Sequence, residues 1–206
     1  MQSSSVTHVE SAAARSPLIR AAYEKASAAH AGQIRNGSGG LPYIEHPVAV
    51  AVRLEGHGYG EEVLAAALMH DVVEDSPATV EDLRREFGDR VAELVDALSD
   101  DEAIADYRQR KDEHRARVRR YDGDAFAIYG ADKLANSSTL QRALAREGDA
   151  VRREFKVPLE LKLEVWEDDA AMLRREAPEL PYLDELDETL SLLRADLASA
   201  GPRSGR

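Results

Sequence analysis

Apolar residues recur every three or four positions along most of the chain, which is the spacing of helices that bury one face. No segment alternates apolar and polar residues as a half-buried strand would, and we find no hairpin signal or internal repeat. The sequence therefore predicts an all-α fold, a bundle of roughly eight to ten helices. We expect these helices at 17–30, 44–57, 61–74, 79–87, 89–98, 101–120, 125–144, 159–173 and 182–197.

The 206 residues are enough for one sizeable core. Residues 1–16 are rich in Ser and Ala, and we expect them to be disordered, as is the tail 201–206. Residues 17–200 are expected to form a single domain, with 158–200 as a helical extension. Residues 1–16 lack the apolar region of a secretion signal, and no apolar stretch reaches the roughly 20 residues that span a bilayer. We therefore expect a soluble, cytoplasmic protein without a membrane partner.

Charge and cysteine content exclude several classes of function. The formal net charge of -12 argues against nucleic acid as a partner, because non-specific duplex binding needs a basic surface. The chain has no cysteine, so disulfides, thiolate zinc sites and a cysteine nucleophile are excluded. An anionic small molecule remains a candidate substrate, because a bound metal and a few arginines can reverse the local field.

The pair His70-Asp71 is the most informative feature, because it closes the apolar run 63–69 at the end of a predicted buried helix. Charges in such a place are costly unless they are paired or bound to a metal. Glu74 and Asp75 follow one helical turn later, where they could orient and activate a water molecule near a cation held by the pair. The alternative, a solvated helix end, is about as well supported by these residues alone.

Two further residues could complete a metal site. His30 ends a helix of small residues, and Asp132 lies inside an apolar helix. Each has a plainer interpretation: His30 as a core histidine bonded to a backbone carbonyl, and Asp132 as the ion-pair partner of Lys133. With His70 and Asp71 they make a mixed nitrogen and oxygen set, which suits manganese or iron better than calcium.

Other polar residues could support this site or bind a ligand. His46, before Pro47, could hold a metal ligand in place or could simply contact a helix start. Arg35, Asn36 and Ser38 lie in a glycine-rich loop, where Arg35 could bind phosphate, although such a loop alone is a weak signal. Asn136 lies one turn after Asp132 and could reach a base or ribose.

Two further features, one basic and one aromatic, are expected to have only a structural role. The basic run 115–120 is expected to be a solvated face of a charged surface helix over 101–120, and Trp166 is expected to belong to the core.

Five motifs follow one another along the chain. They are His30 to Gln33, Pro42 to Pro47, Ala65 to Ser76, Glu86 to Gly88 and Ala131 to Asn136. With these motifs the chain resembles the HD-domain hydrolases of the RelA/SpoT family, and in particular the single-domain small alarmone hydrolases, over about residues 17–145. We expect the synthetase domain of the long members to be absent, because the chain is too short to hold it.

The resemblance implies an HD-domain helical bundle and a manganese-dependent hydrolase that removes the 3′-pyrophosphate of guanosine tetra- or pentaphosphate. The products would be GDP or GTP and pyrophosphate. It implies His30, His70, Asp71 and Asp132 as metal ligands, with Glu74 and Asp75 acting on the water molecule. It also implies that Arg35 faces the phosphates or base, that Asn136 and Thr139 face the nucleoside, and that His46 supports the metal ligands. Asn36 and Ser38, in the same loop as Arg35, are expected to be further substrate-binding residues.

Two positions depart from the family pattern, because Asn36 stands where a lysine is frequent and Ser137-Ser138 where an arginine is frequent. Substrate choice therefore stays open between the guanosine alarmone and another nucleotide, such as an adenosine alarmone or the 2′-phosphate of NADPH. A third interpretation is a binding module that sequesters a nucleotide or pairs with a toxin-like protein or a second copy. The intact pair Glu74-Asp75 argues against that interpretation.

Overall fold

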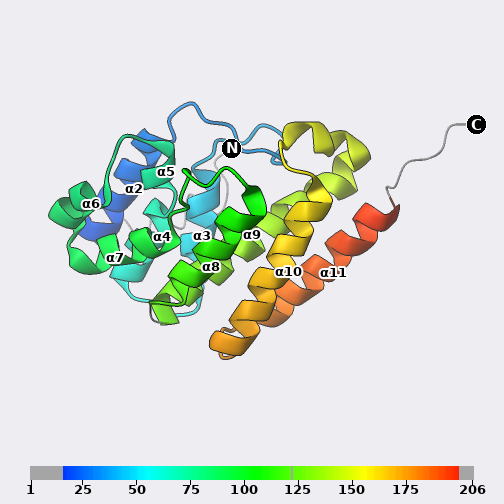
Figure 1. The fold of residues 1–206 in the computed structure, drawn as a ribbon. Helices are drawn as coiled ribbons and strands as arrows, with labels where there is room; N and C mark the ends of the chain where they lie inside the picture. Colours follow the sequence, from blue (N-terminus) through cyan, green and yellow to red (C-terminus); the bar gives the residue numbers. More distant parts are fainter. Residues whose placement is uncertain (1–15, 122, 200–206) are drawn as a thin grey trace, which may run out of the picture.

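The computed structural model describes residues 16–121 and 123–199 (Figure 1). All regular elements in this part of the chain are helices, and its one isolated β-bridge pairs Ile34 with Pro42, so the all-α prediction is confirmed. The elements are α2 (Pro17–Ala29), α3 (Glu45–Gly56), α4 (Glu61–Met69), α5 (Val72–Asp75), α6 (Val80–Phe87), α7 (Asp89–Leu98), α8 (Tyr107–Val118), α9 (Gly123–Glu147), the 3-10 helix η1 (Gly148–Glu154), α10 (Leu159–Glu176) and α11 (Leu183–Ser199).

The first described residue is a helix cap. Ser16 is buried; its hydroxyl accepts a hydrogen bond from the backbone N–H of Ile19 and donates one of 2.8 Å to Glu61. The expectation of disorder up to residue 16 is therefore wrong for Ser16, because α2 needs a capping oxygen at this position. The rest of the N-terminal prediction, and the tail 201–206, lie outside the described residues.

The helix predicted over 61–74 is divided at the His70-Asp71 pair. Helix α4 ends at Met69, and the short helix α5 begins at Val72. The backbone keeps near-helical angles at both intervening residues, and the carbonyl of Asp71 accepts the N–H of Asp75 at 3.0 Å. The break places the two polar side chains at a junction between helices and not on a helix face.

Helix α6 begins and ends where the sequence predicts. The hydroxyl of Thr79 accepts the N–H of Asp82 at 3.1 Å, and the carboxylate of Asp82 accepts the N–H of Thr79 at 3.0 Å, which is a complete capping box. Gly88 then ends the helix with φ of 89°, a backbone angle that favours glycine.

The charged segment 101–120 departs from its prediction as a long surface helix. Helix α8 spans only residues 107–118, and it buries His114, Arg115 and Val118. Arg115 is buried because its guanidinium donates a hydrogen bond of 2.7 Å to the carboxylate of Asp169, which is fully buried on α10. Part of the basic run is therefore a buried ion pair and not a solvated face.

The long helix α9 lies at the centre of the molecule and packs against α3, α10 and α11 (Figure 1). Gly130 permits the closest of these contacts, because a Cβ atom there would lie 3.1 Å from Tyr182 and 3.2 Å from Leu173. The buried apolar cluster extends from Ile19 on α2 to Leu197 on α11, so the C-terminal helices share the core with the rest.

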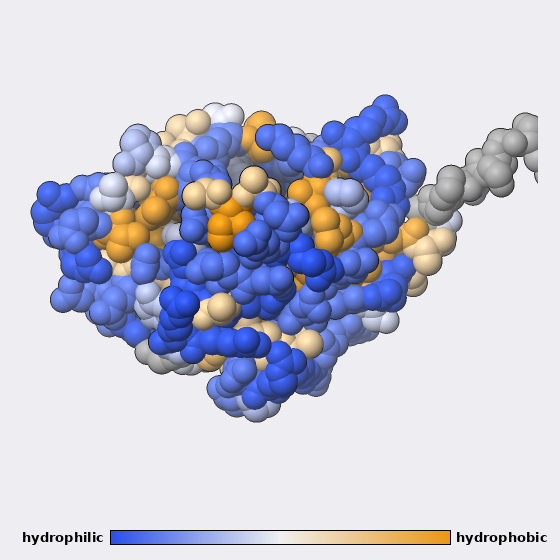
Figure 2. All heavy atoms as spheres, in the orientation of Figure 1, coloured by the Kyte–Doolittle hydropathy of each residue, from blue (hydrophilic) through white to orange (hydrophobic). Residues whose placement is uncertain are grey.

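One face of the molecule is mainly polar (Figure 2). Figure 2 shows a face coloured mostly as hydrophilic, with apolar residues in small separate patches. No helix in the described part of the chain is long and apolar enough to cross a membrane.

Candidate metal centre

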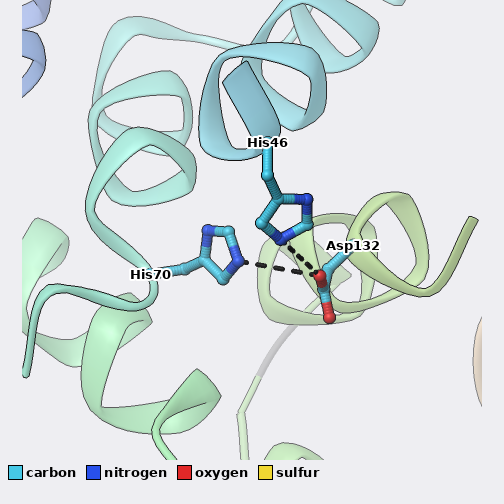
Figure 3. A group of neighbouring side chains, drawn as sticks. All are labelled: His46, His70 and Asp132. Atoms are coloured by element: carbon cyan, nitrogen blue, oxygen red, sulfur yellow. Dashed lines mark ion pairs between the residues drawn. The ribbon is translucent and has the colours of Figure 1, made fainter. Parts of the chain in front are cut away.

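Three side chains from different elements meet beside α9 (Figure 3). They are His46 in the first turn of α3, His70 just after α4, and Asp132 on α9. The Nε2 atom of His46 lies 3.0 Å from Oδ1 of Asp132, and Nε2 of His70 lies 3.6 Å from the same oxygen. The candidate ligand atoms all lie within 4.8 Å of one another, so one ion could contact all three.

Asp71 adds a second carboxylate to this group. Its Oδ2 atom lies 3.3 Å from Nε2 of His70 and 3.7 Å from Nε2 of His46. The hydroxyl of Tyr43 donates a hydrogen bond of 2.7 Å to the same oxygen, which fixes the carboxylate in place. We call His46, His70, Asp71 and Asp132 the four-residue group.

The donor set of this group fits a divalent cation. Nδ1 of His70 lies 2.8 Å from the carbonyl oxygen of Ala67, so this nitrogen carries the proton and donates. In the neutral ring, Nε2 of His70 is the nitrogen with the lone pair; it is buried and has no hydrogen-bond partner among the described residues. A buried nitrogen without a partner, facing two carboxylates, is the arrangement of a metal-ligating imidazole held by a backbone carbonyl.

The charges of the group differ sharply between its two histidines. Burial, together with the positive charge of Arg35, lowers the pKa of His46 to about 4. Burial acts the same way on His70, but Asp71 and Asp132 outweigh it and raise the pKa of His70 to about 9. Lys133 and the two histidines hold the pKa of Asp132 well below its usual range, despite its burial. Negative charge therefore concentrates on the carboxylates, and a metal would take the place of the proton on His70.

The structure separates His30 from this group. Its Nδ1 atom lies 2.9 Å from Oε1 of Gln33 and 3.4 Å from the carboxylate of Asp75, and its ring packs against Tyr43 at 4.6 Å between centroids. The two histidines have thus exchanged their expected places: His46 lies with the candidate metal ligands, and His30 contacts Gln33 and Asp75 outside that group. The exchange arises because α3 packs on α9, whereas α2 packs on α4.

The two acids after the pair also point to different places. Glu74 lines the cavity beside the four-residue group, and its Oε1 accepts the N–H of Asp100 at 2.7 Å. Burial and the carboxylates of Asp71 and Asp100 raise the pKa of Glu74 to about 7. Asp75 is exposed and contacts His30, and it lines neither of the cavities described below. Of the two acids, Glu74 is therefore the one beside the cavity.

The metal-side cavity has a volume of about 210 Å³. Its walls include cations and aromatic rings from α8, α9 and α10 that the sequence did not indicate as site residues. These residues are Tyr107, Arg110, Lys111, His114, Tyr129, Lys133, Lys162 and Trp166. The ion pair between Asp132 and Lys133, which the sequence did suggest, is present at 2.9 Å. Trp166 is buried as expected, and it also lines the cavity.

A second cavity of about 430 Å³ shares the side chain of His46 with the first. Arg35, which lines the second cavity, donates a hydrogen bond of 2.8 Å to Oδ1 of Asn136, which lines the first. Arg35, Ser38 and Thr139 line the second cavity, and Asn136 lines the first. Asn36 is exposed and lines neither, while Arg142 and Arg146 supply positive charge to the second cavity.

The chain matches the model of one protein family, described as the HD domain, over residues 22–157. It is 40% identical over 142 residues to the bifunctional (p)ppGpp synthase/hydrolase SpoT of Escherichia coli K12, a match that covers 63% of this chain and 20% of SpoT. It is 32% identical over 157 residues to a guanosine-3′,5′-bis(diphosphate) 3′-pyrophosphohydrolase of Aquifex aeolicus VF5, covering 72% and 22% of the two chains. The chain therefore spans about a fifth of the length of these curated relatives.

Two solved structures resemble the fold over nearly their whole length. One is lmo0812 of Listeria monocytogenes EGD-e, with a TM-score of 0.65, 32% identity, and coverage of 71% of this chain and 96% of that one. The other is described as a metazoan ortholog of SpoT that hydrolyses ppGpp, with a TM-score of 0.69, 28% identity, and coverage of 86% and 97%.

Proposed function

Because the chain belongs to the HD-domain family, whose model matches residues 22–157, we propose that it is a metal-dependent nucleotide hydrolase. Its substrate is guanosine tetra- or pentaphosphate, from which it removes the 3′-pyrophosphate to leave GDP or GTP. The observation that carries the proposal is the four-residue group on the wall of a cavity that also holds Glu74 and several cations. The names of the SpoT-type relatives support the same substrate.

The four-residue group is the proposed metal site, with His46 taking the place that the sequence suggested for His30. Two imidazole nitrogens and two carboxylates make a mixed set that suits Mn²⁺ among the divalent ions. When bound, the cation would supply a Lewis acid that polarises a phosphate oxygen and favours deprotonation of water.

Glu74 is the proposed general base. A base works best when its pKa lies near the operating pH, and the pKa of Glu74 is raised to about 7. In the reaction, the oxygen of a water molecule forms a bond to the phosphorus attached to the 3′ oxygen, and the bond between that phosphorus and the 3′ oxygen breaks. Glu74 takes a proton from the water, and the departing 3′ oxygen gains one. We propose that Asp75 keeps the His30 ring in place, since Oδ2 of Asp75 lies 3.4 Å from Nδ1 of His30.

The residues between the two cavities would orient the nucleotide. Arg35 lines the second cavity and donates a hydrogen bond to Asn136, which lines the metal-side cavity, so its guanidinium would contact the phosphates or the base. Asn136 lies on the metal side, and Ser38 and Thr139 line the second cavity, where we place the nucleoside. Asn36 is exposed, and we leave its expected contact with substrate as a prediction. The cytoplasmic location and the partner proteins expected from the sequence also stay predictions.

A panel of nucleotides with the manganese-loaded protein tests the proposal. Guanosine tetraphosphate should yield GDP and pyrophosphate, separated by ion-exchange chromatography, and the adenosine counterpart should react more slowly. Release of orthophosphate from NADPH at a comparable rate would instead favour NADPH as the substrate. If the metal-loaded protein turns over no nucleotide, both hydrolase hypotheses are contradicted, and a protein that only binds nucleotides becomes the better hypothesis.

A further inference from the structure

Lys162 on α10 brings an ammonium group into the metal-side cavity. Three aromatic rings surround its Nζ atom, with their centroids at 5.5 Å for Tyr107, 5.6 Å for Phe155 and 5.3 Å for Trp166. Rings at these distances stabilise a cation and restrict where it can point. Its position is therefore built by the fold and is not that of a free surface lysine.

The other cations of this cavity have carboxylate partners. Lys133 pairs with Asp132 at 2.9 Å, and Lys111 and Arg110 both pair with Asp100. Among the described residues, Lys162 forms no ion pair or hydrogen bond with a carboxylate. Burial and the nearby charges of Lys111, Lys133 and Arg35 outweigh the attraction of Asp132 and lower the pKa of Lys162 to about 8.

The acids of the cavity do not offset this charge. Asp71 and Asp132 belong to the proposed metal site, and Glu74, the proposed general base, accepts the N–H of Asp100. Asp169 pairs with Arg115: its Oδ1 accepts hydrogen bonds from Arg115 at 2.7 Å and from Tyr129 at 2.8 Å, and its Oδ2 is buried without a hydrogen-bond partner among the described residues. The side of the cavity formed by α8 and α10 is thus left positive and is suited to an anion.

We propose that Lys162, with Lys111 beside it, binds the phosphate group of a pyrophosphate ester that lies farther from the metal centre. This inference rests on the proposed function and narrows its substrate class. A metal at the four-residue group would neutralise the phosphate next to the nucleoside, but a pyrophosphate carries further charge that needs a second cation. Lys162 supplies that cation, and so the cavity selects pyrophosphoryl esters over single phosphoryl esters.

The same geometry makes the site composite. The family model ends at residue 157, whereas Lys162 and Trp166 belong to α10, which packs on α8 and α9 (Figure 1). The C-terminal extension therefore supplies part of the wall of the binding cavity, in addition to packing against the core.

Lys162→Met tests the proposal, because methionine keeps the apolar stem against the aromatic rings and removes the charge. Lys156→Met is the matched control, since Lys156 is an exposed lysine outside the cavity. The manganese-loaded full chain is titrated calorimetrically with pyrophosphate and, separately, with orthophosphate. Lys162→Met should weaken pyrophosphate binding by about 10- to 100-fold, the value of one charge-assisted hydrogen bond, and should change orthophosphate binding by less than about twofold. Lys156→Met should change neither, and Lys162→Arg should retain most of the pyrophosphate affinity.

Equal pyrophosphate affinity in wild type and Lys162→Met would overturn the proposal, as would an equal loss of affinity for both anions. The hydrolase proposal is tested separately by turnover of guanosine tetraphosphate. If that nucleotide is hydrolysed while Lys162→Met leaves KM and inhibition by pyrophosphate unchanged, the role of Lys162 is contradicted and the proposed hydrolase activity is supported. If pyrophosphate binding depends on Lys162 but no nucleotide is hydrolysed, the binding site stands and the proposed reaction fails.

Discussion

The Nε2 atom of His46 lies 3.0 Å from Oδ1 of Asp132, and this contact joins the first turn of α3 to the middle of α9. The contact makes His46 a member of the candidate metal centre, and it leaves His30 to contact Gln33 and Asp75 instead.

Substitution of the two histidines should therefore have different effects on metal binding. His46→Ala removes a ligand atom, and we expect the affinity for Mn²⁺ to fall by more than about 100-fold, since loss of a supporting residue alone costs about 10- to 100-fold. His30→Ala should cost no more than about tenfold. Electron paramagnetic resonance of free Mn²⁺ measures both affinities. A larger loss in His30→Ala than in His46→Ala would restore the assignment that the sequence suggested.

Glu74→Gln should separate binding from chemistry. The amide keeps the size of the side chain and can still contact the N–H of Asp100 through its oxygen, but it cannot accept the proton. We expect kcat to fall by about 10²- to 10⁴-fold, the usual contribution of a general base, with Mn²⁺ affinity within a few fold of wild type. Asp75→Asn is the control and should keep kcat within about tenfold of wild type. Full activity of Glu74→Gln would remove Glu74 from the reaction.

The buried network behind the site should contribute to stability. Asp169 is fully buried and accepts hydrogen bonds from Arg115 and Tyr129. Asp169→Ala leaves the Arg115 charge without its buried partner, and we expect the free energy of unfolding to fall by about 3–5 kcal/mol. Glu164→Ala is the control, because Glu164 is an exposed partner of Arg108 and its loss should cost less than about 1 kcal/mol. Urea denaturation measures both, and similar values for the two variants would show that the buried pair adds nothing.

The charge of Lys162 should make pyrophosphate binding depend on pH. Burial and the positive charges of Lys111, Lys133 and Arg35 oppose the protonation of Lys162, whereas Asp132 favours it. The net effect lowers the pKa of Lys162 to about 8. Below that pH the ammonium is charged and attracts the anion, and above it the charge is lost. The ratio of wild-type to Lys162→Met affinity should therefore fall toward one between about pH 7 and pH 9.5. Calorimetry across this range measures the ratio, and Lys162→Arg should show a constant ratio because arginine stays charged. A wild-type ratio that does not change with pH would contradict the assignment.

Local patterns in the sequence predict much of the fold. The spacing of apolar residues indicates the helices, and Thr79 and Gly88 mark the ends of α6, because caps depend on neighbouring residues alone. The break between α4 and α5 is not predictable in this way, since both residues at the junction keep near-helical angles.

The site is predictable only as far as residues adjacent in sequence carry it. His70-Asp71 and Glu74 stand out because they interrupt an apolar pattern, and all three lie at the cavity. The choice between His30 and His46 depends on which helix packs against α9, and no local pattern records that packing. Lys162 is missed for the same reason, because its helix follows the recognisable motifs and reaches the cavity only through the tertiary fold.

Hydrolysis of guanosine tetraphosphate in ¹⁸O-labelled water, followed by phosphorus NMR, tests the central claim most directly. Attack of water on the phosphorus next to the 3′ oxygen predicts GDP and pyrophosphate, with the label in the pyrophosphate and none in GDP. The manganese-loaded protein should give this pattern, and Glu74→Gln should slow it without changing it. Label in orthophosphate, or release of orthophosphate in place of pyrophosphate, would contradict the account.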